Sequence, residues 1–549
     1  MLHLSKKYNL LITVLMFSLH LSAQKKDTRP NIVLIMVDDL GYSDIGAFGS
    51  EINTPNLDKL AFGGLRLSEF YNNSICAPTR ASLLTGQYPH KAGVGYFDVN
   101  LGLPAYQGFL NKESLTLAEV LKSGGYSTLM SGKWHVGGDS LYWPKQRGFD
   151  KFYGITKGAA NYFDVQPLPF GKTPYPVTLL EDNTRLFPAD NSYYFTDEIG
   201  NHAVRFLDEQ QKENKPFFLY LAFTAPHWPL QAKPEDIAKY KGRYDEGWDV
   251  LRKKRIERQL SGGILSKDQS IALRDTEVPE WDKLTYDEQQ FWKAKMEVYA
   301  AMIDNMDQNV GKVVNKLQEL KKDENTLIIF ISDNGAQGGF NSYNPLNRGL
   351  VKNIGTVGTA GSFDYQEQNW AYLSNTPLRQ YKNNFHEGGF SSPFIAYYPK
   401  KIQSGRIDKG VAHLIDLAPT FYEIASVKYP AIHNGVKTNI PVGKSLVPVF
   451  FNNDAEVKRE EPIFWERAGN RAVRAGKWKI VSTYPSYIWE LYNLDVDRGE
   501  TKNLAEEYPE IVNQLSVKYF EWADKTGVIE YSKFKLGNEF IPGASPKKQ

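Results

Sequence analysis

Four stretches of the chain are almost continuously apolar, and each one stops abruptly at polar residues. Apolar runs of this length without alternation are typical of strands buried on both faces, as in a parallel sheet covered by helices. The four runs are residues 31–37, 126–130, 216–223 and 326–331. The pattern therefore predicts a large, mostly parallel sheet whose strands end at polar side chains.

Helical patterns separate these runs. Residues 115–122, 196–211 and 286–321 carry apolar side chains at helical spacing. The alternation of strands and helices predicts an α/β fold with helices flanking the sheet. Because ligands of such folds bind beyond the carboxyl ends of the strands, we expect the functional site at that edge of the sheet.

The pattern changes near residue 451. Short strands, including residues 472–481 and 489–494, are followed by a helix near residues 509–524. We therefore expect a main α/β domain over residues 24–450. A smaller C-terminal α+β subdomain with a short antiparallel sheet is expected over residues 451–549.

Residues 1–23 have the features of a signal peptide. Lys6 and Lys7 precede an apolar stretch over residues 10–21, and Ser22-Ala23-Gln24 offers a cleavage site with small residues. The apolar stretch is too short to span a bilayer comfortably, and no second hydrophobic run follows it. We expect an exported protein, periplasmic or secreted, without stable insertion in a membrane.

The overall charge gives no support to a nucleic-acid-binding function. The 549 residues include 65 Lys and Arg against 63 Asp and Glu, a formal net charge of +2. A local basic run, residues 252–255, is interleaved with acidic residues in a helical stretch, residues 245–260. This stretch predicts a solvated helix face with i,i+4 ion pairs. Any anionic ligand must therefore be held by a local site.

The single cysteine of the chain, Cys76, lies in the sequence Cys-Ala-Pro-Thr-Arg. A lone cysteine of an exported protein is either a small buried apolar side chain or a reactive group. Pro78 suits a first helical turn and Gly86 suits the position after a helix end, so Cys76 is expected at a helix N-terminus, which favours anions. Arg80 follows one turn later on the same face. The pattern favours an oxyanion or sulfate pocket over a structural cysteine.

Acidic and amide side chains follow two of the predicted strands. Asp38 and Asp39 end the first run, and Asp333 and Asn334 follow the last. Three carboxylates and one amide suit a hard cation, Ca²⁺ or as the alternative Mg²⁺, better than zinc. Each pair alone is weak evidence, because Asp and Asn are common in turns. Both pairs at the ends of buried strands predict a metal site.

Basic and histidine side chains follow the other two predicted strands. Lys133 and His135 come after the second run, and His227 comes after the third. Lys382, in a polar segment further along the chain, is one more candidate. Such groups can neutralise a bound anion and transfer protons.

These motifs together resemble the formylglycine-dependent (type I) sulfatases, of alkaline-phosphatase-like fold, and within them the bacterial arylsulfatase branch. The matching motifs run in order through nearly the whole mature chain: Asn-Ile-Val-Leu-Ile-Met-Val-Asp-Asp, Cys-Ala-Pro-Thr-Arg with Leu-Thr-Gly, Gly-Lys-Trp-His-Val-Gly, Ala-Pro-His-Trp-Pro, Ser-Asp-Asn-Gly, His-Glu-Gly-Gly, Asp-Leu-Ala-Pro-Thr and Trp-Glu-Leu-Tyr-Asn-Leu. The motif Cys-x-Pro-x-Arg is highly specific, because a formylglycine-generating maturation enzyme reads it to oxidise the cysteine.

The resemblance implies a sulfuric ester hydrolase that acts on a sulfated small molecule or a sulfated glycan. Cys76 would become formylglycine, whose hydrate binds the metal and attacks sulfur. The implied Ca²⁺ ligands are Asp38, Asp39, Asp333, Asn334 and the modified Cys76. The implied roles of the remaining residues are orientation of the hydrate by Arg80 and His135, neutralisation of sulfate oxygens by Lys133 and Lys382, and protonation of the leaving oxygen by His227.

Two other functions stay open on the sequence. A phosphodiesterase or phosphonate monoester hydrolase on the same scaffold would use the same metal, nucleophile and cations. A non-catalytic glycan- or sulfate-binding protein could keep the fold, but pure binding does not require Cys76 in a modification motif.

The segment over residues 336–381 lacks clear periodicity and is rich in Gly, Asn, Ser and aromatic residues. Loops over a pocket commonly select the substrate, and flat aromatic rings can stack on an aryl or pyranose ring. The aromatic residues considered are Phe340, Tyr343, Phe363, Tyr365, Trp370 and Tyr372. We hypothesise that Trp370 or Tyr372 lines the leaving-group subsite; the alternative is that these rings pack the loop onto the domain.

Overall fold

A large sheet forms the centre of the molecule in the computed structural model, which describes residues 27–168, 176–188, 192–213, 215–339 and 356–534. The predicted signal peptide lies outside the described residues. The sheet has ten strands, whose order and bounds are β10 (Arg406–His413), β2 (Leu65–Tyr71), β9 (Ser391–Tyr397), β8 (Thr326–Ser332), β1 (Asn31–Val37), β7 (Phe217–Ala222), β3 (Ser127–Gly132), β4 (Lys151–Ile155), β5 (Leu179–Glu181) and β6 (Thr184–Arg185).

The centre of this sheet is parallel. β1 pairs in parallel with both β7 and β8, and β3 pairs in parallel with β7 and β4. A fifth parallel pair joins β10 to β2. β9 is antiparallel to its neighbours β2 and β8, and β5 is antiparallel to its neighbours β4 and β6. The four predicted apolar runs form the contiguous strands β8, β1, β7 and β3, which confirms the mostly parallel sheet.

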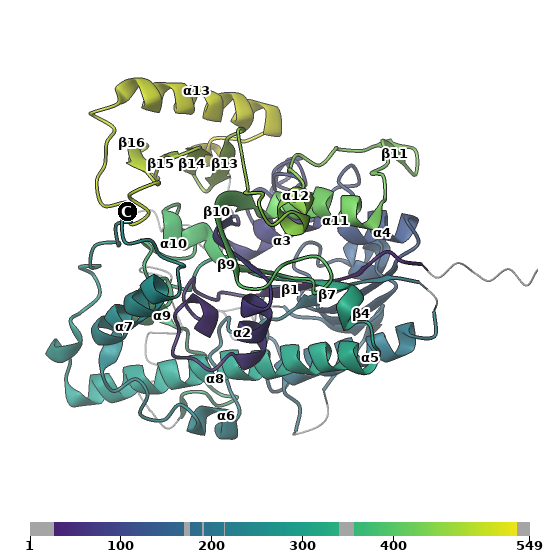
Figure 1. Cartoon of the computed structure of the whole chain (residues 1–549), viewed down its shortest axis with the longest axis horizontal. Helices are drawn as coiled ribbons and strands as arrows, with labels where there is room; N and C mark the ends of the chain where they lie inside the picture. The colour runs from purple at the N-terminus through teal and green to yellow at the C-terminus, as the bar shows by residue number, and fades with distance from the viewer. Residues whose placement is uncertain (1–26, 169–175, 189–191, 214, 340–355, 535–549) are drawn as a thin grey trace, which may run out of the picture.

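Helices cover both faces of the sheet because the central strands are apolar on both sides. In β1, Ile32 and Leu34 enter one core, and Val33 and Ile35 enter the other. The helices over the first face are α3 (Cys76–Thr85), α4 (Leu117–Ser123), α11 (Leu417–Ala425) and α12 (Val447–Phe451). Those over the second are α2 (Pro55–Phe62), α5 (Phe195–Gln210), α7 (Gly247–Ser261), α8 (Tyr286–Glu319) and α9 (Glu367–Ser374). Figure 1 shows the two layers, with α8 running along the lower one.

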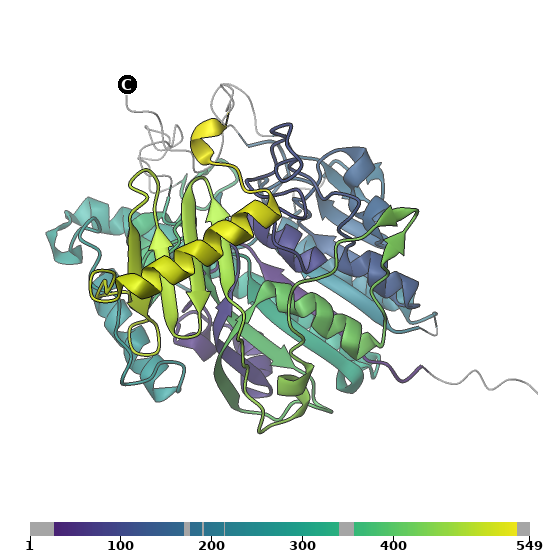
Figure 2. The same ribbon diagram turned by 90° about the horizontal axis from the view of Figure 1, so that it is seen from above.

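A second, antiparallel sheet lies towards the C-terminus. Its strands are β13 (Ile463–Arg467), β14 (Asn470–Ala475), β15 (Trp478–Ser482) and β16 (Trp489–Asn493). α13 (Pro509–Thr526) crosses one face of this sheet (Figure 2). The stretch expected as one strand over residues 472–481 is two strands, because the chain turns at Gly476, whose φ is 57°. α12 spans the division expected at residue 450, and that boundary stays a prediction.

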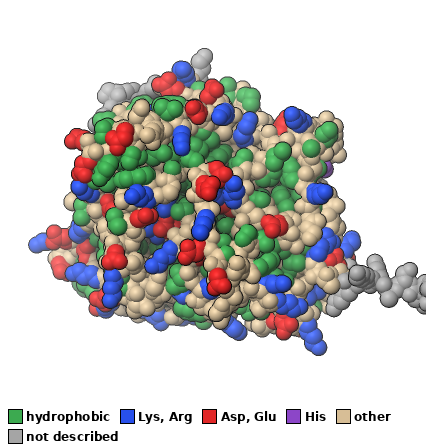
Figure 3. Space-filling view, turned by 45° about the horizontal axis from the view of Figure 1, so that its top comes forward, with side chains coloured by type: hydrophobic (Ala, Val, Ile, Leu, Met, Phe, Trp, Pro, Cys, Tyr) green, Lys and Arg blue, Asp and Glu red, His purple; other side chains and the backbone are tan. Residues whose placement is uncertain are grey.

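The surface is mixed in charge. In Figure 3, acidic and basic side chains are interspersed over the visible face, in keeping with the small net charge. None of the helices in the described part of the chain is both long and apolar enough to cross a membrane.

Candidate active site

Polar side chains from four neighbouring strands meet at the carboxyl edge of the large sheet. Asp38 and Asp39 follow β1, Asp333 follows β8, Lys133 follows β3 and His227 follows β7. These strands are adjacent and parallel, so their ends lie at one edge. The structure thus brings together the groups that the sequence placed at the ends of its apolar runs.

The helix α3 brings Cys76 and Arg80 to this edge. Cys76 is its first residue, and Gly86 ends it in a left-handed conformation. The Arg80 guanidinium is fully buried and donates to Asp333 Oδ2 at 3.0 Å and to the Lys133 carbonyl at 3.1 Å. Although burial opposes its charge, Tyr220 and the nearby carboxylates hold the pKa of Arg80 above its usual value. Arg80 therefore stays a permanent cation beside Asp333.

The thiol of Cys76 is buried and protonated. Burial raises its pKa, and the attraction of Lys133 and Lys382 does not reverse that effect. A protonated thiol is a poor nucleophile. Cys76 as an unmodified cysteine is therefore not set up to attack a substrate.

Two lysines hold two of the carboxylates. Lys133 Nζ bonds Asp38 Oδ2, and Lys382 Nζ donates to Asp39 Oδ1 at 2.6 Å. Asn334 Nδ2 also donates to Asp39 Oδ1, at 2.6 Å. Although burial opposes ionisation, Lys133 and the other cations keep the pKa of Asp38 well below its usual value. Lys382, expected from the sequence as a separate candidate, lies in this same cluster.

Three oxygen atoms of the cluster are buried without a hydrogen-bond partner. They are Asp38 Oδ1, Asp39 Oδ2 and Asn334 Oδ1. Burial and repulsion from Asp38 raise the pKa of the fourth group, Asp333, to about 8. Buried oxygens are normally hydrogen-bonded or bound to a cation, and hard oxygen ligands suit Ca²⁺ or Mg²⁺. The donor set therefore fits a divalent cation.

The two histidines differ in their surroundings. His227 Nδ1 lies 2.6 Å from the Trp228 carbonyl, and its Nε2 lies 3.6 Å from Asp39 Oδ2. Burial lowers the pKa of His227 to about 4. Single atoms of Asp38, Asp39 and His227 lie within 4.8 Å of one another, so His227 borders the group of oxygens. Its bonded Nδ1 leaves Nε2 to face the site.

His135 faces Asp98, a residue that the sequence analysis did not single out. His135 Nε2 lies 3.6 Å from Asp98 Oδ2, and Lys157 Nζ bonds the same oxygen at 2.9 Å. Both ring nitrogens of His135 are buried without a hydrogen bond. Burial and the charge of Lys133 lower the pKa of His135 to about 3. Asp98 stands outside any motif, so only the folded structure reveals it.

Asn375 joins the segments that carry the site. Its Oδ1 accepts hydrogen bonds from the backbone N–H groups of Ala336, at 3.0 Å, and Tyr42, at 3.4 Å. Its Nδ2 donates to the carbonyls of Gln380 and Gly388, both at 2.7 Å. These four groups belong to the segments after β1 and β8, the segment before Lys382 and α10 (Glu387–Phe390). One buried amide thus ties the segments of both acidic pairs to that of Lys382.

Strained backbone surrounds the site. Four non-glycine residues there have φ in the left-handed region: Asp39 at 66°, Ser74 at 62°, His135 at 60° and Asn383 at 73°. Such conformations cost about 1–3 kcal/mol each and persist where the surrounding structure imposes them, often at functional sites. The loops therefore adopt defined conformations beyond the strand ends.

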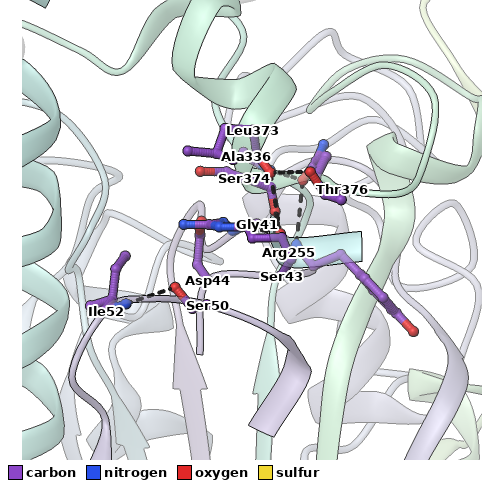
Figure 4. Close-up of polar contacts among 12 residues, drawn as sticks. Gly41, Ser43, Asp44, Ser50, Ile52, Arg255, Ala336, Leu373, Ser374 and Thr376 are labelled. Carbon is purple, nitrogen blue, oxygen red and sulfur yellow. Dashed lines mark hydrogen bonds and ion pairs between the residues drawn. The ribbon is translucent and has the colours of Figure 1, made fainter. Parts of the chain in front are cut away.

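The helix α7 differs from the expectation of a solvated face. Arg252 and Arg255 are buried, whereas Lys253 and Lys254 point outward. Arg255 bonds Asp44 Oδ1 at 2.7 Å and Ser43 Oγ at 3.0 Å, in the segment that follows the metal-site candidates Asp38 and Asp39 (Figure 4). The expectation is wrong for these two arginines because Arg255 pairs with Asp44 and Glu51, and Arg252 donates to carbonyl oxygens of distant segments.

The aromatic residues Trp370 and Tyr372 of the segment 336–381 differ in their surroundings. Trp370 is fully buried, donates its Nε1–H to the Trp292 carbonyl at 2.7 Å and packs edge-on against Trp248. It is a core residue, so its proposed place in a subsite is wrong. Tyr372 instead lines a cavity that also contacts Lys382. Phe340 and Tyr343 lie outside the described residues.

The comparisons with known proteins agree with this geometry. Residues 30–427 match the family model described as Sulfatase, and residues 380–525 match "N-sulphoglucosamine sulphohydrolase, C-terminal". An uncharacterized sulfatase of Schizosaccharomyces pombe is 36% identical, with 92% of this chain and 95% of the relative covered. The arylsulfatase of Klebsiella aerogenes is 36% identical, covering 73% of this chain and 87% of the relative.

A solved structure is similar over the same length. The crystal structure of Ps i-CgsB in complex with k-i-k-neocarrahexaose has a TM-score of 0.67 and 28% sequence identity, covering 92% of this chain and 95% of that one. The family match spans well over half of the chain and includes the candidate site. The protein therefore belongs to the formylglycine-dependent sulfatase family and is a sulfatase.

Proposed function

We propose that this sulfatase hydrolyses an aryl or carbohydrate sulfate ester with a formylglycine derived from Cys76 and a bound Ca²⁺. The observation that carries the proposal is the surroundings of Cys76. Its thiol is buried and protonated, yet it lies beside two lysines and the partnerless carboxylate oxygens. That environment suits an anionic ester and a metal, but it does not activate a thiol. Conversion of the side chain by a formylglycine-generating enzyme resolves the conflict.

Asp38, Asp39, Asp333 and Asn334 would hold the cation. When bound, Ca²⁺ would act as a Lewis acid that offsets charge on the sulfuryl oxygens. Arg80 donates to Asp333 Oδ2 at 3.0 Å, and this fixed positive charge opposes the burial that raises the pKa of Asp333. A bound cation would favour the carboxylate further. The same arginine fixes the orientation of the start of α3, where Cys76 lies.

Lys133 and Lys382 would bind the sulfate oxygens of the ester. Both ammonium groups are buried, and each already bonds a carboxylate. Hydrogen bonds to charged groups in such a dry site are stronger than in water. The lysines therefore position the ester and stabilise charge that develops on it.

His227 would protonate the leaving oxygen. The contact of its Nδ1 with the Trp228 carbonyl orients the ring and leaves Nε2 towards the site. Burial keeps the imidazole neutral in the free site, and the negative charge of a bound ester would favour its protonation. His135, held between Asp98 and the site, would orient the modified side chain of residue 76.

The relatives support a substrate class, and the sequence supports a location. A Klebsiella relative is named arylsulfatase, and the Ps i-CgsB structure contains a neocarrahexaose. We infer that a sulfated small molecule or glycan is the substrate here too. The signal-peptide pattern of residues 1–23 supports export to the periplasm or the medium.

Hydrolysis of 4-nitrophenyl sulfate, compared with bis(4-nitrophenyl) phosphate and a phenylphosphonate monoester, tests this function. We expect the highest kcat/KM for the sulfate ester and loss of all three activities in Cys76→Ala. Asn309→Ala, at a buried position on α8, is the matched control and should keep its activity. Preference for a phosphorus ester, or an active Cys76→Ala enzyme, would contradict the proposal.

A further inference from the structure

A cavity of about 620 Å³ lies beside the candidate active site. Its walls are the segments 272–277 and 378–384 of the main domain, together with β16 and residues 499–503 near the C-terminus. Lys382 is part of its lining, and Lys382 Nζ is 2.6 Å from Asp39 in the acidic cluster. The volume is in the range of sites for small molecules. A group attached to an ester held at Lys382 would therefore lie next to this cavity.

The charges that line the cavity balance. Among its described lining residues, the cations are Arg252, Arg274, Arg379 and Lys382, and the anions are Asp275, Glu277, Glu490 and Glu500. Four positive and four negative side chains leave no net charge. A polyanionic chain would need an excess of cations here.

The cations of the lining are also already engaged. Arg252 donates to the Tyr372 carbonyl at 2.8 Å, and Arg274 bonds Asp249 at 3.1 Å. Arg379 Nη1 donates to the Tyr492 hydroxyl at 2.9 Å, and Glu490 lies 3.8 Å from the same nitrogen. Binding a second sulfate or a carboxylate would compete with these contacts, which disfavours a further anionic group.

Hydrogen-bonding groups predominate in the lining. The side chains of Tyr372, Tyr381 and Tyr492 are largely buried, and the Tyr381 hydroxyl donates to Asp275 at 2.6 Å. Carboxylates, guanidinium groups and hydroxyls form hydrogen bonds with the hydroxyl groups of a sugar. The lining therefore suits a hydroxyl-rich and uncharged ligand.

We propose that this cavity binds the neutral saccharide portion of a sulfated glycan, next to the sugar that carries the scissile sulfate. The proposal rests on the sulfatase function proposed above and specifies its substrate class. It predicts selection for glycans without uronic acids or additional sulfates in the part that enters the cavity. A small aryl sulfate would react without using the cavity.

The test fills the cavity without touching the acidic cluster. Thr276 is exposed on the segment 272–277 and lines the cavity, so Thr276→Trp narrows it. Thr184→Trp, at an exposed position in β6, is the matched control. A second variant, Tyr492→Phe, removes the hydroxyl that bonds Arg379.

The probes are 4-nitrophenyl sulfate and two mixtures of monosulfated oligosaccharide isomers, one built of neutral hexoses and one containing hexuronates. We expect the wild-type enzyme to prefer the neutral mixture by about tenfold or more in kcat/KM. Thr276→Trp should lower kcat/KM for that mixture about tenfold and change the value for 4-nitrophenyl sulfate less than about twofold. Tyr492→Phe should act in the same direction, and Thr184→Trp should match the wild type.

Several results would overturn the proposal. Preference for the hexuronate mixture would contradict the charge argument. An equal loss of kcat/KM for 4-nitrophenyl sulfate and the neutral mixture in Thr276→Trp would show that the cavity does not select saccharides. No loss of kcat/KM for either substrate would show that the substrate does not enter the cavity. Inactivity of the wild-type enzyme, with formylglycine present, on every sulfate ester would instead contradict the proposed function itself.

Discussion

Replacing Asn375 with alanine tests whether the loops around the site are held in place by one buried amide. The Asn375 side chain has no exposed surface and makes four hydrogen bonds to backbone groups. Two of these groups lie close in sequence to metal-ligand candidates, since Ala336 follows Asn334 by two residues and Tyr42 follows Asp39 by three. The substitution therefore releases both ligand-bearing loops and the segment of Lys382 at once.

The expected magnitude follows from the hydrogen bonds that are lost. The alanine variant leaves the N–H of Ala336 and the carbonyls of Gln380 and Gly388 buried without this partner, and each such group costs about 1–3 kcal/mol. Since water can enter part of the space, we expect a loss of about 3–5 kcal/mol in the free energy of unfolding. Loss of support around metal ligands typically weakens metal binding by about 10- to 100-fold.

The assay combines Ca²⁺ titration by calorimetry, kcat/KM for 4-nitrophenyl sulfate and the melting temperature. Asn375→Asp should act more strongly, because a carboxylate oxygen would face the Gln380 and Gly388 carbonyls. Asn309→Ala is the control: Asn309 is buried on α8, bonds Asp197 at 2.8 Å and should affect the melting temperature alone. If Asn375→Ala melts lower but binds Ca²⁺ and turns over as the wild type does, the network has no positioning role.

Three further predictions concern the metal, the core and the pH dependence of stability. Chelation of Ca²⁺ should abolish sulfatase turnover and Ca²⁺ addition should restore it; activity that resists complete removal of metal would contradict the site. Trp370→Ala should lower the free energy of unfolding by about 3–5 kcal/mol and leave the KM of the folded enzyme unchanged, whereas a raised KM at unchanged stability would place it in a subsite. Burial raises the pKa of Asp307 to about 6, so its native state binds the proton more tightly than the unfolded chain and stability falls as pH rises from about 4 to 6. Denaturation at several pH values should show that Asp307→Asn removes about 3 kcal/mol of this fall, and identical pH profiles would refute it.

The centre of the sheet is predictable from the sequence because its strands are apolar on both faces. β1, β7 and β8 contain long apolar runs, and β3 contains a shorter one beside Ser and Thr; the burial of these strands explains the pattern. The strands β2, β9 and β10 are not predicted by the same reasoning. β2 contains Arg66 and Glu69, which are buried because Arg66 bonds the Ala47 carbonyl and Glu69 pairs with Arg474. Partners from distant segments allow these polar side chains to be buried in β2, and no local sequence pattern predicts such partners.

The same division holds at the site. Residues at strand ends, such as Asp38 and His227, follow from the apolar runs that precede them. The contacts of Asn375 and Asp98 depend on which loops meet in the folded structure. The sequence therefore gives no signal for these two residues beyond their polarity. Trp370 shows the opposite error, since an aromatic residue in an irregular stretch suggested a ligand contact but belongs to the core.

The mass of the peptide that contains Cys76, from protein produced with its own maturation system, tests the central claim most directly. The account predicts an aldehyde in place of the thiol, reactive towards hydrazides, in a fraction that equals the fraction of active enzyme. Fully active sulfatase whose Cys76 peptide retains an unmodified thiol would contradict it.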